Sequence, residues 1–369
     1  MIRIYIDRFP ELQTWYADQM TPMIFQKPVQ SSSIIGANSC LGGLSQTVAT
    51  LPERSIRDIL LTPMDDLCRQ YTWIQEYVML CDVTASYPVF RKRHPGHRNS
   101  GVRALYIEQY CDCKIFQEAF QDTGISHEAS IRSWKKLGIV IKKAQEKLQS
   151  LNGIIEQKFN YSFLTDEIRG ELAERMGIPV CPYCNRQYIQ PVTIDGKKRY
   201  LGDLDHILPK SLYALFSMSL WNLTPSCKVC NQMFKKDKGL PVLNPQERGF
   251  DEDCIFTLDY NNVCEIVGLQ PPTGMQWEIQ PSADAATKHL LENNLNVFRL
   301  NEVYDYHRRD VQRALQRRYR KESIGYCRSL KRLPLDLDDP WLWYGVSLEP
   351  SKFQEELLSK MIYDTVLYN

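Results

Sequence analysis

The sequence has no hydrophobic run that approaches the ~18 apolar residues of a membrane-spanning helix, and it contains no internal repeat or low-complexity tract. The first fifteen residues lack the basic, apolar and small-residue regions of a signal peptide. No phosphate-binding loop ending in Gly-Lys-Ser/Thr is present, so any dependence on ATP must come from a partner. We therefore expect a cytoplasmic protein that is not associated with a membrane.

The chain also lacks an excess of charge of either sign, because 45 Lys and Arg residues are balanced by 44 Asp and Glu residues. A nucleic-acid-binding protein usually carries a basic surface, so the whole-chain balance argues against that class. The distribution is uneven, however, because residues 181–240 contain nine Lys or Arg and four Asp or Glu. A basic segment therefore lies within an acidic remainder.

Length and composition indicate a globular protein of two or three domains, with 369 residues of which 43% are hydrophobic and 24% charged. Hydrophobic periodicity predicts an α+β protein that is predominantly helical. Residues 1–178 are interpreted as a mostly helical region for partner docking or sensing, in which the Ser- and Gly-rich residues 27–50 form a linker. Residues 179–245 hold the densest chemistry, and residues 246–369 combine a hairpin with basic helices. The shorter elements that the pattern predicts are a strand at Ile2–Ile6, hairpin turns at Asp195–Gly196 and Asn261–Asn262, one or two long amphipathic helices over 285–332, and a helix at Lys352–Leu367.

Twelve cysteines in a reducing compartment favour metal binding where they are paired closely and core packing where they are isolated. Cys181-Pro-Tyr-Cys184 and Cys227-Lys-Val-Cys230 are two Cys-x-x-Cys pairs separated by 42 residues. Two such pairs can complete a closed tetrahedral site, which predicts a structural Zn²⁺, whereas a thioredoxin-like redox pair would need a βαβ context. The other eight cysteines are expected to be structural. Cys111 and Cys113 lie in helical sequence, and six isolated cysteines should be small buried apolar residues: Cys40, Cys68, Cys81, Cys254, Cys264 and Cys327.

Between and just after the pairs lie residues suited to phosphodiester hydrolysis. The second strand of the first hairpin, Tyr200–Leu204, is expected to deliver Asp205 and His206 to its end. Asn231 follows the last cysteine at the start of a short helix. Asp and Asn oxygens suit Mg²⁺ or Mn²⁺, and an adjacent imidazole can take a proton from water. Positive charge for a phosphate is expected from Lys210, Lys235 and Lys236.

This ordered set, with Asn222 between the two pairs, resembles the HNH endonuclease family of the ββα-metal fold in its zinc-stapled form. The resemblance implies that Asp205 and Asn231 hold the catalytic Mg²⁺ or Mn²⁺ and that His206 is the general base. It also implies that Asn222 ties down the loop that presents His206. The last position of the motif is often His in the family and is Asn231 here; a carboxamide oxygen at that position favours Mg²⁺ over softer metals.

The sequence departs from the family pattern three residues after Asn231, where Phe234 replaces the usual lysine. Lys235 and Lys236 follow, and the choice of phosphate-contacting lysine stays open. A looser similarity to HNH nuclease subunits of bacterial anti-phage systems, of the Septu and retron-associated types, rests on Asn244–Pro245 and on Leu295–Asn296 before an Arg-rich helix. In those systems the nuclease works with an ATPase, which implies a partner of that kind.

The Arg-rich helix over Tyr304–Lys321 has seven Lys or Arg and two Asp. One face recurs at helical spacing and should be buried: Leu300, Tyr304, His307, Val311 and Leu315. Another face could grip a nucleic-acid backbone or could be a solvated or subunit-facing surface: Arg309, Arg313, Arg317 and Arg320.

The other histidines are expected to play structural or loop roles. His94 and His97 lie in the basic stretch Arg91–Arg98 and could ligate a metal, but Pro95 and Gly96 favour a solvated loop near phosphate. His127 and His289 have no carboxylate and amide partners nearby in sequence and are interpreted as packed residues.

The leading functional interpretation is a metal-dependent HNH endonuclease that hydrolyses DNA, as an effector of anti-phage defence. RNA cleavage is an alternative, because the candidate residues do not read the sugar. The other alternative is a non-catalytic zinc module that binds nucleic acid or scaffolds a complex.

Overall fold

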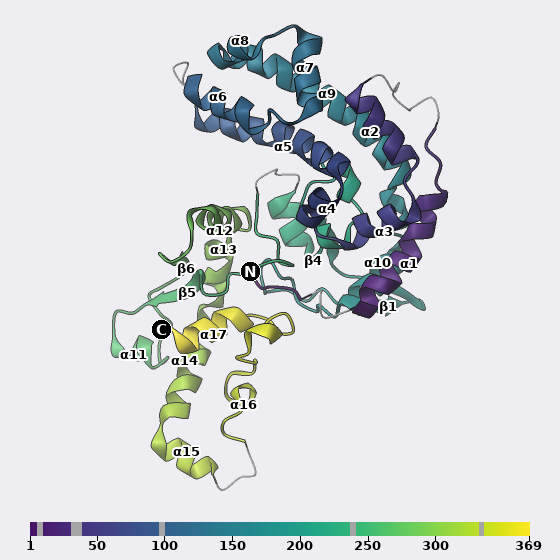
Figure 1. Cartoon of the computed structure of the whole chain (residues 1–369). Helices are drawn as coiled ribbons and strands as arrows, with labels where there is room; N and C mark the ends of the chain where they lie inside the picture. Colours follow the sequence, from purple (N-terminus) through teal and green to yellow (C-terminus); the bar gives the residue numbers. More distant parts are fainter. Residues whose placement is uncertain (6–9, 31–38, 96–99, 237–240, 332–335) are drawn as a thin grey trace. The chain divides into compact units, whose positions relative to one another are not determined.

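A computed structural model describes residues 1–5, 10–30, 39–95, 100–236, 241–331 and 336–369 (Figure 1). The chain divides into two compact units. Unit 1 contains Met1–Leu12, Thr165–Ile207 and Thr224–Asn369, and unit 2 contains Gln13–Leu164 and Leu208–Leu223. This division differs from the predicted boundaries at 178 and 245, because the segment 208–223 packs with the N-terminal helices while the regions on either side of residue 245 share one unit.

Unit 2 is helical, as the periodicity predicts. Two long helices, α5 and α9, lie side by side and are visible in Figure 1. The side chain of Ser133 caps α9 by accepting a hydrogen bond from the Lys136 amide. Tyr77 on α5 donates to Asn152 on α9 at 2.9 Å inside the core. Its helices are α1 (Pro10–Gln26), of which all but the first three residues lie in this unit, α2 (Cys40–Ala49), α3 (Glu53–Leu61), α4 (Met64–Gln70), α5 (Thr72–Arg93), α6 (Ser100–Gln109), α7 (Lys114–Thr123), α8 (His127–Arg132) and α9 (Trp134–Lys158).

The linker prediction for residues 27–50 is wrong over its second half, where α2 forms. Ser39 caps α2 by accepting from the Gly42 amide, and Leu41, Leu44 and Val48 are buried at helical spacing. The small residues of this segment therefore lie in a capped helix and not in a linker. Residues 31–38 of the predicted linker lie outside the described part of the chain.

The first half of unit 1 contains α10 (Asp166–Met176) and three short strands: β1 (Pro191–Ile194), β2 (Lys197–Tyr200) and β3 (Asp203–His206). The predicted turn is confirmed, because β1 and β2 pair in an antiparallel hairpin with Asp195 and Gly196 at φ of 51° and 73°. The predicted second strand does not continue to Asp205. It ends at Tyr200, and β3 pairs instead with β4 (Leu223–Ser226).

Gly202 explains this break. A Cβ atom at this position would lie 2.6 Å from the Ser226 carbonyl oxygen, so only a residue without a side chain lets the chain pass β4 this closely. The helix η6 (Val229–Lys235) follows β4 and has π geometry, in which the Lys236 amide donates to the Asn231 carbonyl at 2.8 Å.

The second half of unit 1 contains the predicted hairpin of residues 254–279. Strands β5 (Cys254–Asp259) and β6 (Gly274–Ile279) are antiparallel, but Asn261 and Asn262 do not form a tight turn between them. Asn262 instead caps the short helix α11 (Val263–Ile266) by accepting from the Glu265 amide. Phe256, Trp277 and Tyr304 pack ring against ring in the core beside this hairpin.

The basic region is a series of shorter helices and not one or two long ones. Arg299, with φ of 53°, separates the helix that ends at Val297 from the one that begins at Leu300. The predicted apolar face is buried, because Leu300, Val311 and Leu315 are at most 2% exposed. The helices are α12 (Ala285–Val297), α13 (Leu300–Tyr304), α14 (Arg308–Glu322), α15 (Ile324–Leu330), α16 (Pro340–Tyr344) and α17 (Ser359–Leu367).

The start of unit 1 forms no strand over residues 1–5. The Ile2 and Ile4 amides nevertheless donate to the carbonyl oxygens of Pro182 and Pro245 at 2.9 and 2.7 Å. None of the helices in the described ranges has the length and hydropathy that a membrane crossing requires.

Candidate zinc site and adjacent polar cluster

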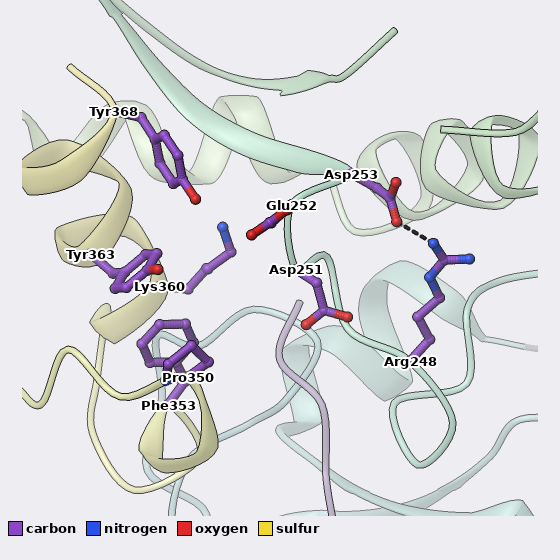
Figure 2. Close-up of a pocket in the computed structure, with 9 residues that line it drawn as sticks. All are labelled: Arg248, Asp251, Glu252, Asp253, Pro350, Phe353, Lys360, Tyr363 and Tyr368. Carbon is purple, nitrogen blue, oxygen red and sulfur yellow. Dashed lines mark hydrogen bonds and ion pairs between the residues drawn. The ribbon is translucent and has the colours of Figure 1, made fainter. Parts of the chain in front are cut away.

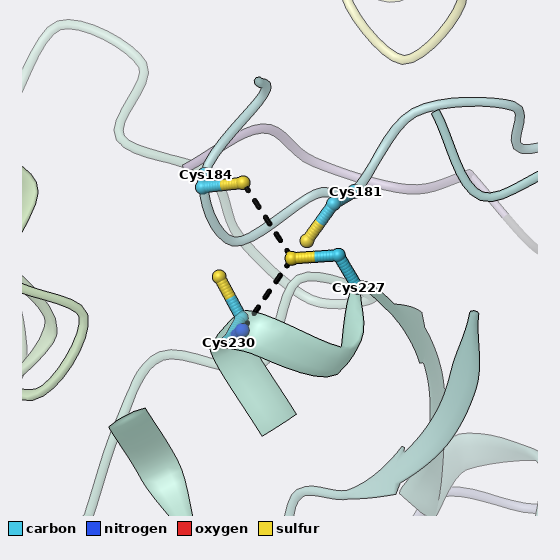
Figure 3. A group of neighbouring side chains, drawn as sticks. All are labelled: Cys181, Cys184, Cys227 and Cys230. Carbon is cyan, nitrogen blue, oxygen red and sulfur yellow. Dashed lines mark hydrogen bonds between the residues drawn. The ribbon is translucent and has the colours of Figure 1, made fainter. Parts of the chain in front are cut away.

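The two Cys-x-x-Cys pairs come together in unit 1 (Figure 3). All four side chains are buried, and their sulfur atoms lie within 4.8 Å of one another, with the Sγ atoms of Cys184 and Cys227 4.0 Å apart. Zn–S bonds of about 2.3 Å in a tetrahedron would place sulfur atoms about 3.8 Å apart. The quartet therefore has the donor type, number and spacing that a structural Zn²⁺ needs, as the sequence predicts.

Backbone hydrogen bonds close the turn of each pair, and in the second pair one amide also points at a sulfur. The Asn185 amide donates to the Cys181 carbonyl at 2.7 Å, and the Cys230 amide points at the Cys227 sulfur at 3.4 Å. Hydrogen bonds with the other three thiols hold the pKa of Cys227 well below its usual range, while burial raises the pKa of Cys181. A cation at the centre would offset this cost of burying thiolates.

The other cysteines follow the prediction in part. Cys81 and Cys254 are buried, as expected, but Cys264 is exposed. All twelve cysteines carry free thiols.

Asp205 lies at the centre of a buried polar cluster next to the zinc site. Lys235 donates to its two carboxylate oxygens at 2.9 and 2.8 Å, and Tyr183 donates to Oδ2 at 2.5 Å. The side chains of Lys235 and Asp205 are only 4% and 5% exposed. Burial raises the pKa of Asp205, and the hydrogen bonds from Lys235 and Tyr183 offset that rise in part.

This arrangement corrects the expected role of Lys235. A lysine available to a phosphate should be exposed, but this ammonium is sequestered by Asp205 and also contacts the His206 carbonyl oxygen. Lys236 is exposed, and Lys210 is exposed with its ammonium 4.4 Å from the centre of the Tyr161 ring. Of the three predicted phosphate-directed lysines, two therefore remain accessible.

Asn231 does not bond to Asp205, its predicted partner at the catalytic cation. Its side-chain amide donates to Asp203 at 3.0 Å, and Gln232 donates to the same carboxylate oxygen at 2.8 Å. Asp203 and Asp205 are two residues apart on β3, so their side chains share one face of the strand. The helix η6 thus bonds to both acidic residues of β3, through Asn231 and Lys235.

Sequence reasoning missed Asp203 and Tyr183. Asp203 could have been found from the alternation Asp-Leu-Asp, because period two puts both carboxylates on the side of the strand that faces a following helix. Tyr183 stands between the cysteines of the first pair, and its ring stacks on Phe298 with centroids 4.5 Å apart. No pattern in the sequence points from that tyrosine to Asp205.

His206 is half-buried at the end of β3. The chain leaves the strand here and enters the loop that Asn222 holds. Asn222 accepts from the Leu208 amide at 2.7 Å, and its Nδ2 donates to the carbonyl oxygens of Leu208 and Phe216 at 3.2 and 3.0 Å. These bonds hold the backbone at Leu208 and Phe216.

The donor set beside His206 fits a hard cation in the kind of atom it offers, because Asp203, Asp205 and Asn231 all carry oxygen ligands. A cation at Asp205 would compete with the Lys235 ammonium for that carboxylate. Among the described residues, the cysteine quartet is where three or more His, Cys, Asp or Glu side chains lie close enough together to share one ion.

The arginine face on α14 is exposed at all four predicted positions: Arg309, Arg313, Arg317 and Arg320. Arg317 donates to the Tyr344 carbonyl at 2.9 Å, and Arg313 lies 3.3 Å from Asp310. Arg317 therefore holds α16, while the other three positions present charge at the surface.

The interpretation of the remaining histidines as packed residues agrees with half-buried His307 and His289, whereas His127 is exposed. His307 is half-buried and bonds to Asp310 and Arg186, and His127 bonds to Gln117. His94 packs on the Phe90 ring at 5.1 Å, whereas His97 lies outside the described residues. His289 is half-buried, with Asn293 at 3.4 Å.

Unit 1 also contains a cavity of about 410 Å³ near its C-terminal helix α17 (Figure 2). Figure 2 shows Lys360, Tyr363 and Phe353 on one side and Arg248 with Asp253 on the other. Its cationic side chains are already paired, since Arg248 contacts Asp253 and Lys360 donates to Asp364 at 2.6 Å. This cavity contains none of the predicted catalytic residues.

Comparisons with known proteins find no matching family model, curated protein or solved structure.

Proposed function

We propose that the protein is a metal-dependent HNH-type endonuclease that hydrolyses phosphodiester bonds of DNA. The observation that carries the proposal is the bonding of helix η6, which begins within the second cysteine pair, to the strand that ends in His206. Through this bonding Asn231 reaches Asp203 and Lys235 reaches Asp205. A base, oxygen ligands and a zinc staple thereby come from two segments of unit 1, residues 181–207 and 224–235.

In this proposal His206 takes the proton of the attacking water. Asp205 and Asn231, with Asp203 behind Asn231, would hold Mg²⁺ or Mn²⁺, which stabilises negative charge on the phosphate and on the leaving oxygen. Asn222 is a positioning residue, because its bonds to Leu208 fix the loop that follows His206. Lys210, Lys236 and the exposed arginines of α14 would attract the nucleic-acid backbone.

The biological setting that the resemblance implies is anti-phage defence together with a partner ATPase. RNA as the substrate stays open in this proposal, because neither His206 nor the oxygen ligands distinguish the sugar. Parallel assays on plasmid DNA, single-stranded DNA and RNA separate these substrates.

The decisive experiment compares His206→Ala with the wild-type protein for plasmid nicking in Mg²⁺. Because His206 is half-buried at the end of a strand, its removal should leave the fold intact and lower cleavage by about 10²-fold or more, the usual worth of a general base. Unchanged cleavage by the variant, measured with and without the partner ATPase, would contradict the assignment.

Asn231 and Gln232 supply a matched pair for the cation site. Both donate to Asp203, but the proposal gives a ligand role to Asn231 alone. Asn231→Ala should raise the Mg²⁺ concentration needed for half-maximal nicking, while Gln232→Ala should leave it within about twofold. Equal effects of the two substitutions would mean that both act through Asp203 and that neither holds the cation.

One observation favours a second candidate, a non-catalytic zinc module that binds nucleic acid. The charge of Asp205 is already paired with a buried lysine, and the arginine face of α14 is exposed. This candidate predicts DNA binding that does not need Mg²⁺, and no cleavage of DNA or RNA with or without the partner.

A further inference from the structure

We infer that the ammonium group of Lys235 is a built-in competitor of the catalytic cation, which can bind Asp205 only after this lysine has left it. Lys235 thereby sets the cation concentration at which the site is loaded. The inference rests on the proposed function, because the cation concerned is the one that Asp205 and Asn231 would hold. It adds to that function a form of regulation that depends on a single side chain.

The carboxylate of Asp205 already has as many donors as it can accept. An ionised carboxylate has about four acceptor positions on its two oxygens. Lys235 donates to both oxygens, at 2.9 and 2.8 Å, and Tyr183 donates to Oδ2 at 2.5 Å. The backbone amide of His206 provides a fourth hydrogen bond. A metal ion needs one of these positions, so one donor must move before the ion binds.

Lys235 is the donor that can move. The ring of Tyr183 is fully buried and stacks on Phe298 with centroids 4.5 Å apart, and the amide of His206 belongs to the backbone of β3. Lys235 is the last residue of η6, and its ammonium is carried on a flexible four-carbon stem. When the lysine withdraws, the other two donors stay in place and keep Asp205 oriented toward a cation.

The backbone directly after Lys235 indicates that this end of η6 is held under strain. Lys236 has φ of 49° and ψ of −149°, a region that residues with a side chain rarely adopt. Strain of this kind persists only where neighbouring contacts hold it, and it is common in segments that switch between two conformations. The contacts that hold the end of η6 here are those of the Lys235 ammonium with Asp205 and the His206 carbonyl oxygen. Release of the lysine would therefore also relieve Lys236.

The position of the ammonium is itself suited to a metal ion. Three oxygen atoms surround it, two from the carboxylate of Asp205 and one from the backbone of His206. Oxygen is the ligand atom that Mg²⁺ and Mn²⁺ prefer. The side chain of Asp205 is only 5% exposed, so its charge requires a positive partner close by. Either the ammonium or a divalent ion can supply that charge, and removal of the lysine should turn a weak cation site into a strong one.

The test is Mn²⁺ binding to the full-length, zinc-loaded protein, followed by the electron paramagnetic resonance signal of free Mn²⁺ with no nucleic acid present. Lys235→Ala should bind one Mn²⁺ per chain at least about tenfold more tightly than the wild type, because in the wild type the ion binds only the minor form in which the lysine has left. Asp205→Asn/Lys235→Ala should lose this tight site. Equal Mn²⁺ affinity in Lys235→Ala and the wild type would overturn the inference.

Lys198→Ala is the matched control. It removes a lysine that pairs with Glu171 and Glu174 in the same unit, away from Asp205, and should change the Mn²⁺ affinity less than twofold. A gain in affinity as large as that of Lys235→Ala would mean that the loss of any positive charge strengthens cation binding, and it would overturn the inference.

Urea unfolding keeps the test decisive if Lys235→Ala folds poorly. A ligand stabilises the folded state that binds it, so millimolar Mn²⁺ should raise the urea midpoint of Lys235→Ala and change that of the wild type much less. A Lys235→Ala protein that Mn²⁺ does not stabilise would show that a cation cannot take the place of the lysine, and it would overturn the inference.

Plasmid nicking separates this inference from the proposed nuclease. Lys235→Ala should reach half-maximal nicking at a lower Mg²⁺ concentration than the wild type. Nicking by the wild type without a gain of Mn²⁺ affinity in Lys235→Ala would overturn the inference and leave the nuclease standing. A gain of Mn²⁺ affinity without nicking by any of these proteins would contradict the nuclease and support a cation site that Lys235 controls.

Discussion

The ammonium group of Lys235 donates to both carboxylate oxygens of Asp205, and both side chains are almost fully buried. Two opposite charges that are removed from water together depend on each other, because either one alone would be left without compensation. The two residues are thirty positions apart in the sequence, Lys235 on helix η6 and Asp205 on strand β3, so their contact joins these two elements.

We expect Lys235→Met to destabilise the protein by about 3–5 kcal/mol, the usual result of removing one partner of a buried ion pair. Asp205→Asn/Lys235→Met should recover much of that loss, because no charge then remains buried. Urea unfolding of the three proteins at pH 7 measures both values. The control is Lys198→Met, which removes a lysine with a 42% exposed side chain that pairs with Glu171 and Glu174 and should change stability far less. A double variant no more stable than Lys235→Met would contradict the pairing.

The sequence was sufficient to predict the parts of unit 1 that depend on one residue type at one spacing. Cysteine pairs and the Asp195–Gly196 turn belong to this group, because a tetrahedral ion and a backbone with positive φ each admit few residues.

The partners of Asp205 could not be predicted, because they depend on the register of a helix against a strand. Asn231 and Lys235 are four residues apart and share one face of the helix, but the sequence does not show which strand residues that face will meet, because this depends on how η6 packs. Likewise, the break at Gly202 follows from a close approach to Ser226, a residue far along the chain.

Removal of zinc should disrupt the polar cluster as well as the staple. Elemental analysis should find about one Zn per chain in the wild type and much less in Cys184→Ser, while Cys264→Ser, at an exposed cysteine, should retain it. Metal binding in such knuckles is coupled to folding, so Cys184→Ser should also unfold earlier on heating. Because Tyr183 lies between the first two ligands and bonds to Asp205, nicking activity should be lost with the metal. Full activity in a zinc-free protein would contradict this coupling.

The exposed arginines of α14 should determine how steeply DNA binding depends on salt. The triple variant Arg309→Ala, Arg313→Ala and Arg320→Ala should reduce the slope of log K against log salt by about 2–3, because each phosphate contact contributes about 0.9. Arg317 is left in place because it bonds to Tyr344. The same number of exposed lysines on α9, Lys135, Lys136 and Lys142, forms the control triple variant. An unchanged slope in the arginine variant would assign this face to solvent or to another subunit.

Glu265 should make unit 1 sensitive to acid. Its carboxylate accepts from the Asn261 amide at 3.1 Å and from the Thr273 amide and hydroxyl, both at 2.9 Å, and these bonds lower its pKa below the usual value of 4.5. A carboxyl whose pKa is lowered by folding stabilises the folded state above its unfolded pKa, and this contribution disappears as the pH falls through the folded pKa. Glu265→Gln should therefore unfold at a lower urea concentration than the wild type at pH 7, and the difference should shrink below about pH 4.5. A constant difference between Glu265→Gln and the wild type from pH 7 to pH 3 would contradict the linkage.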